Sequence, residues 1–101
     1  MITSSGTCKH VNGGYPSYCY NGNVNFQSIC EGYCTSEASC VGYFYHASGD
    51  NCYLIPSNNS CPSTFILHPQ TNFAATMNDL VAVSYSGYVC YGKKSGKLNE
   101  M

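Results

Sequence analysis

Residues 30–52, CEGYCTSEASCVGYFYHASGDNC, hold four of the eight cysteines and decide the fold. Cys30 and Cys34 are four residues apart, so in a helix their side chains lie on one face and point into the same neighbouring layer. The run CVGYFYH at 40–46 has the aromatic and β-branched residues of a strand, and the turn signal SGDN separates it from a second short strand at 51–55. The stretch therefore predicts a short helix laid across a β-hairpin and held to it by sulfur.

The cysteine content and the low charge indicate the class of protein. A chain of 101 residues is one domain whose hydrophobic core alone gives a thin margin of stability. Eight cysteines with 9% charged residues indicate a disulfide scaffold made in an oxidising compartment. A zinc module would need paired cysteine knuckles or Cys/His pairs at ligand spacing, whereas His10, His46 and His68 are solitary. We therefore expect disulfides and no metal or other cofactor.

Charge and hydropathy argue against two classes of partner. The net charge is -1 and the chain has no arginine, so it lacks the basic surface that nucleic acid binding requires. No apolar run is long enough to cross a bilayer, and the first residues lack the charged and apolar regions of a signal peptide. Because the cysteines indicate secretion, we expect a mature form or a domain cut from a longer parent.

The expected strand faces follow from alternation around the cysteines. If Cys40 and Cys52 bond to the helix, then Gly42 and Phe44 share the helix side of the sheet, and Gly42 marks a close approach of the helix. The opposite face then collects Val41, Tyr43, Tyr45, Tyr53 and Ile55.

The rest of the chain is expected to add short elements around this centre. The helix should be capped by Asn25 or Ser28, gain apolar contacts from Phe26, Ile29 and Tyr33, and end near residues 35–39. Further strand signals lie at 65–67 and 80–91, the second with a bend at Gly87. The loop 56–63 carries a glycosylation sequon at Asn58. Residues 1–92 are expected to form the domain and residues 93–101 a polar C-terminal tail.

The cysteine frame resembles the PAN/apple domain family. The match lies in the helix cysteines Cys30 and Cys34, in Cys40 ahead of the aromatic run GYFY, in Cys52 within Cys-Tyr-Leu, and in the outer cysteines, and it covers about residues 8–91. The resemblance implies a small α+β domain with a five-stranded antiparallel sheet and one short helix packed across it. It also implies the bonds Cys8 to Cys90, Cys30 to Cys52 and Cys34 to Cys40, which leaves Cys19 and Cys61 to each other. Spacing alone would not choose among the 105 pairings open to eight cysteines.

The family is one of extracellular modules that bind proteins or carbohydrates, and the resemblance implies no enzymatic chemistry. The three histidines have no serine, cysteine or carboxylate motif beside them, so each is interpreted as a loop or strand-end residue. Ten tyrosines offer flat rings with polar tips, which suit sugar stacking or a wet protein interface. Tyr43, Tyr45 and Tyr53 are the candidate ligand-binding residues, although the same rings could build the core of so small a domain.

The first functional hypothesis is a secreted or cell-surface recognition and adhesion module that binds a glycan or an extracellular protein, free-standing or within a larger protein. The second is a subunit of an extracellular filament or matrix, in which tyrosine, asparagine and glycine serve self-association. The third is a small secreted disulfide-rich signalling protein.

Overall fold

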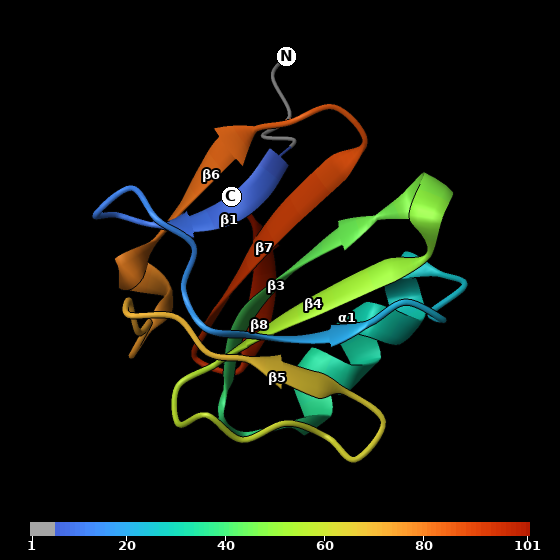
Figure 1. Cartoon of the computed structure of the whole chain (residues 1–101), viewed down its shortest axis with the longest axis horizontal. Helices are drawn as coiled ribbons and strands as arrows, with labels where there is room; N and C mark the ends of the chain where they lie inside the picture. Colours follow the sequence, from blue (N-terminus) through green and yellow to red (C-terminus); the bar gives the residue numbers. More distant parts are fainter. Residues whose placement is uncertain (1–5) are drawn as a thin grey trace.

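A computed structural model describes residues 6–101, which form one α-helix and two antiparallel sheets. Figure 1 shows how these elements are arranged. The first half of the chain contains β1 (Gly6–His10), β2 (Tyr18–Asn21), α1 (Gln27–Ser36), β3 (Cys40–His46), η1 (Ala47–Gly49) and β4 (Asn51–Pro56). The second half contains β5 (Ile66–His68), η2 (Met77–Asp79), β6 (Leu80–Ser84), β7 (Tyr88–Lys94) and β8 (Lys97–Glu100). Residues 1–5 of the expected domain lie outside the described part of the chain.

The sheets are more extensive than the expected single sheet of five strands. Six strands form the main sheet in the order β5-β2-β4-β3-β7-β8, and β1 pairs with β6 in a separate two-stranded sheet. The signal at 80–91 is two strands that belong to different sheets. The turn between them contains Gly87 at a φ of 87°, a backbone conformation that glycine adopts without strain.

Residues 93–101 are folded, so the expected tail is wrong. Strand β7 runs to Lys94, and β8 returns antiparallel to it with Tyr91 opposite Glu100. Ser95 and Gly96, between the two strands, have φ values of 53° and 80°. Two central residues with positive φ fit the right-handed twist of a β-hairpin, which explains why a polar segment adds an edge strand.

The helix uses its cysteines as its buried face, as the four-residue spacing predicts. Cys30 and Cys34 are its buried residues, whereas Phe26 is 64% exposed and Ile29 is also exposed. The expected apolar contacts of Phe26 and Ile29 are therefore wrong, and no side chain caps the helix at Phe26. Tyr33 does pack inward, with its ring 4.9 Å from the ring of Phe65.

The two faces of the main sheet carry two separate cores. The core on the α1 side contains the helix cysteines, Cys19, Cys52, Leu54, Tyr43 and Tyr45. The core under β1 and β6 contains Cys8, Cys90, Ile55, Leu80 and Phe44. In Figure 1 the sheet of β1 and β6 lies at the upper left and α1 at the lower right, behind the strands.

A bulge reverses the alternation that the sequence predicts for β3. The register between β3 and β4 shifts between Cys40 and Gly42, because one extra residue enters β3 there. Beyond the bulge Tyr43 and Tyr45 share the helix side with Cys40, and Phe44 faces the other way. Gly42 consequently approaches β7 and Leu80 rather than the helix: a Cβ on it would lie 2.6 Å from the Tyr91 carbonyl oxygen.

Four disulfides cross-link these layers: three are the pairs that the resemblance implied, and the fourth joins Cys19 to Cys61, the two cysteines outside that frame. Two of them, Cys30–Cys52 and Cys34–Cys40, tie α1 to the β3–β4 hairpin. Cys8–Cys90 ties β1 to β7, and Cys19–Cys61 ties β2 to the loop before β5. Four disulfides indicate that the chain folds in an oxidising environment. Within residues 6–101, the structure has no helix of the length and apolarity that a bilayer crossing needs.

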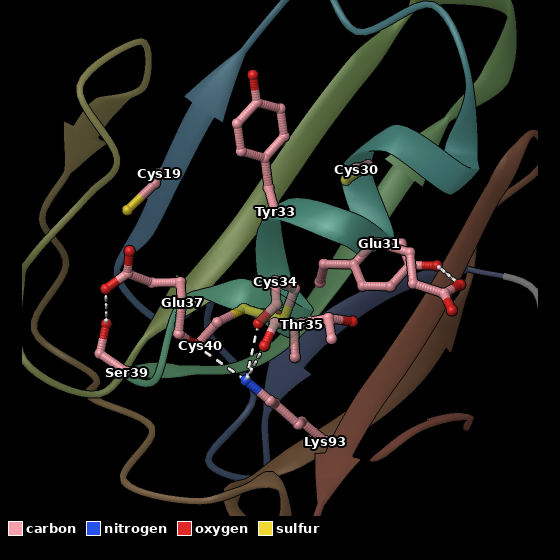
Figure 2. Close-up of a disulfide and its surroundings, with 12 residues drawn as sticks. Cys19, Cys30, Glu31, Tyr33, Cys34, Thr35, Glu37, Ser39, Cys40 and Lys93 are labelled. Carbon is pink, nitrogen blue, oxygen red and sulfur yellow. Dashed lines mark hydrogen bonds between the residues drawn. A yellow bond between two sulfur atoms is a disulfide. The ribbon is translucent and has the colours of Figure 1, made fainter. Parts of the chain in front are cut away.

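Lys93 caps the C-terminal end of α1 through its side-chain ammonium (Figure 2). Its Nζ donates hydrogen bonds to the carbonyl oxygens of Cys34 at 2.7 Å, Glu37 at 3.0 Å and Thr35 at 3.4 Å. The last carbonyls of a helix have no partner within the helix and lie at the negative end of its dipole. The ammonium of β7 therefore fixes the helix end to the sheet.

Candidate functional site

The structure divides the three tyrosines chosen from the sequence between the two faces of the sheet. Tyr43 is fully buried beneath α1, where its hydroxyl donates to Glu31 Oε1 at 3.1 Å and accepts from Gln27 Nε2 at 3.2 Å. The hydroxyl of Tyr45 donates to the Val24 carbonyl at 2.7 Å. Burial raises the pKa of both phenols, so both stay neutral. These two rings belong to the core on the helix side.

Tyr53 lies on the opposite face, within a cluster of aromatic rings. It stands beside Phe44 on the neighbouring strand, with ring centroids 4.4 Å apart and planes 5° apart. Tyr15 stacks on Phe44 at 5.9 Å, and Tyr18 meets Tyr53 edge to face at 5.5 Å. Rings that stack in this way hold one another upright on the sheet.

A pocket of about 180 Å³ opens among these rings. We call it the aromatic pocket, and its lining residues are Thr7, Tyr15, Tyr18, Phe44, Tyr53 and Tyr88. Thr7 and Phe44 are only 2% and 3% exposed, whereas the four tyrosines are half-buried. The buried pair is therefore the floor of the pocket, and the tyrosines form its rim.

Two histidines that do not line the pocket stack on two of its tyrosines. His46 stacks on Tyr88 with centroids 4.4 Å apart, and His68 stacks on Tyr18 with centroids 5.0 Å apart. Each imidazole occupies one face of a rim ring and restricts its rotation, so the pocket is pre-shaped before any ligand arrives. This preorganisation lowers the entropy cost of binding.

The polar groups of the pocket are hydroxyls. The hydroxyl of Tyr15 donates to Thr7 Oγ1 at 3.2 Å, a contact that leaves the Thr7 hydroxyl hydrogen for another acceptor. Burial raises the pKa of Tyr53, and the neighbouring hydroxyl of Tyr88 raises it further, so Tyr53 stays a neutral phenol. The pocket thus combines apolar ring surface with uncharged donors and acceptors.

The remaining sequence candidates lie apart from this pocket. His10 is nearly buried, and its Nδ1 accepts from the Asn12 amide at 3.1 Å in the turn after β1. Asn58 is exposed in the loop after β4, and its Oδ1 accepts from the Ser60 amide at 3.1 Å. Among residues 6–101, no three His, Cys, Asp or Glu side chains gather in a way that could hold a metal ion.

Sequence reasoning missed most of the pocket because its residues come from six segments of the chain. Tyr15 lies in the loop before β2, Thr7 lies on β1, and Tyr88 begins β7. One signal was available in the run Tyr18-Cys19-Tyr20. Neighbouring residues of a strand point to opposite faces, so a cysteine in the core on the helix side places both adjacent tyrosines on the other face of the sheet. The same rule places Tyr53 opposite its neighbour Cys52.

Comparisons of the chain with protein-family models, with curated proteins and with solved structures give no match. The relation to the PAN/apple family therefore stays a prediction from the cysteine pattern.

Proposed function

We propose that the chain is a non-enzymatic extracellular recognition module that binds carbohydrate through the aromatic pocket. The observation that carries this proposal is the pocket itself, which stacked rings and four half-buried tyrosines line on a disulfide-linked scaffold. Apolar walls with a few fixed polar groups are typical of small-ligand sites. Tyrosine suits a sugar because its ring packs against C–H groups while its hydroxyl bonds to sugar hydroxyls.

A glycan array probed with the labelled full chain, followed by calorimetry on the glycans it binds, tests this proposal. We expect Tyr88→Ala to lose binding, because it removes one wall of the pocket. Tyr18→Phe removes a single hydroxyl and should weaken binding with the fold unchanged. Phe26→Ala is the matched control, since it removes an exposed aromatic ring at the start of α1, and this helix packs on the opposite face of the sheet. Equal binding by all three variants would refute the assignment.

A protein contact is the second candidate function, and β6 favours it. Val81 and Val83 are 41% and 38% exposed on this strand, which pairs with β1 along one edge and with no other strand in residues 6–101. An apolar strand with a free edge is suited to pairing with a second copy of itself. Sedimentation velocity across a concentration series tests this: a dimer that Val83→Lys abolishes supports it, and a monomer at all concentrations rejects it.

A further inference from the structure

The size of the aromatic pocket limits what can enter it. Sites for drug-sized ligands measure about 300–1,000 Å³, and this pocket measures about 180 Å³. Its floor consists of Thr7 on β1 and Phe44 on β3, and both residues are almost fully buried. The pocket therefore accommodates one ring that enters from the rim, and the remainder of a longer ligand must stay outside.

The chemistry of the lining disfavours an anionic ring. All six lining residues lack a formal charge, and the raised pKa of Tyr53 keeps its phenol neutral. Lys9 is the one lysine outside residues 93–97. Its ammonium lies over the ring of Tyr15, 4.9 Å from the centroid, and Lys9 does not line the pocket. A carboxylate placed in the pocket would lose its hydration without gaining an opposite charge from the lining.

The floor also supplies a fixed hydrogen bond donor. Thr7 Oγ1 accepts the hydrogen of Tyr15, so the hydroxyl hydrogen of Thr7 is free to be donated to a ligand oxygen. Thr7 sits beside Cys8, whose disulfide to Cys90 holds β1 against β7. The donor is therefore held in place before binding, on a nearly buried residue of the lining.

From these observations we propose that the aromatic pocket takes the terminal, uncharged sugar residue of a glycan, with one ring hydroxyl accepting a hydrogen bond from Thr7. This inference rests on the proposed function and adds to it the charge, the size and the position of the bound residue. A sugar in the middle of a chain carries a substituent on two sides, and one of them would meet the closed floor.

Calorimetry with the full chain tests the charge of the ligand. The probes are methyl glycosides of neutral hexoses and of N-acetylhexosamines, each compared with the methyl glycoside of a hexuronic acid. We expect a neutral glycoside to bind, the hexuronic acid to bind at least tenfold more weakly, and the affinity for the neutral glycoside to be unchanged between low and high salt. Tighter binding of the acid, or an affinity that falls with salt, would overturn the inference and implicate Lys9.

Two variants at one position test the donor. Thr7→Val keeps the shape of the side chain and removes the hydroxyl, and should weaken binding about tenfold. Thr7→Ser keeps the hydroxyl and should retain binding. Equal affinity of the two variants, with unchanged near-ultraviolet circular dichroism, would contradict the role of Thr7.

The position of the bound residue is tested with paired oligosaccharides that carry the same sugar either at the non-reducing end or inside the chain. We expect binding of the first and not of the second. If internal residues bind equally, and Tyr88→Ala abolishes that binding, the inference fails while the pocket remains the recognition site. If no saccharide binds, or if a saccharide binds and Tyr88→Ala leaves that binding unchanged, the proposed function fails with the inference.

Discussion

Removal of the Cys8–Cys90 bond should destabilise the domain far more than removal of Cys34–Cys40. The first bond joins residues 82 apart in sequence and the second joins residues 6 apart. In the chain-entropy model the longer crosslink contributes roughly 4.5 kcal/mol and the shorter one roughly 2 kcal/mol, because the longer loop restricts the unfolded chain more. All four cysteines are buried, so the packing lost on substitution by alanine is similar in the two pairs.

Urea denaturation of the native chain and of the two double variants, Cys8→Ala/Cys90→Ala and Cys34→Ala/Cys40→Ala, measures this difference. We expect the free energy of unfolding of the first variant to be lower than that of the second by about 2–3 kcal/mol. A stability of about 5–15 kcal/mol is usual for a domain, so the first variant loses a large share of it. Equal losses, or a greater loss in the second variant, would refute the view that the long crosslink stabilises this domain mainly through the unfolded chain.

The same pair of variants links stability to the site. Cys8 adjoins Thr7, and Cys90 lies two residues after Tyr88, so this bond holds two lining residues of the aromatic pocket in place. Cys34–Cys40 lies on the helix side of the sheet. Ligand binding should therefore weaken in the first variant and remain in the second, measured where both are folded.

Three further predictions concern the scaffold. Gly42→Ala should lower the free energy of unfolding by about 1–3 kcal/mol, because the added Cβ would lie 2.6 Å from a carbonyl oxygen of β7. Gly32→Ala should raise the free energy of unfolding by up to about 1 kcal/mol, because its added Cβ meets nothing within 4 Å. Chemical denaturation that ranks the two variants in the reverse order would contradict this packing. Lys93→Met should lower the free energy of unfolding by about 1–2 kcal/mol through loss of its bonds to the end of α1, while Lys94→Met, at an exposed position, should change it little. Burial raises the pKa of Tyr43, so the folded chain holds the phenol proton more tightly than the unfolded chain does. The free energy of unfolding should therefore be constant below about pH 10 and fall above it, and the fall should be smaller in Tyr43→Phe. Identical alkaline profiles for the two proteins would contradict the burial of this phenol.

The helix and hairpin could be read from the sequence because their signals are local. A four-residue cysteine spacing, an aromatic run and a turn signal specify α1, β3 and β4 without reference to the rest of the chain. The faces of β3 could not be read in this way, since the bulge between Cys40 and Gly42 depends on pairing with β4. Likewise, the hairpin of β7 and β8 depends on a turn at Ser95 and Gly96, and its second strand, β8, is polar and carries little hydrophobic pattern.

The aromatic pocket was the least predictable feature because local alternation places only Tyr18 and Tyr53 on its face, and no local signal brings the six lining residues together. Its six residues become neighbours only when β1, β2, β4, β3 and β7 are placed in order and the two-stranded sheet covers one end of the face. Composition indicated that tyrosine would matter, but it gave no means of separating Tyr43, which is core, from Tyr53, which reaches the pocket.

The most direct test of the aromatic pocket as the recognition site is a nuclear magnetic resonance titration of the isotope-labelled chain with a glycan selected on the array. We expect amide shifts to concentrate at Thr7, Tyr18, Tyr53 and Tyr88, with α1 unaffected. Shifts that map to α1, or to the exposed face of β6 instead, would contradict it.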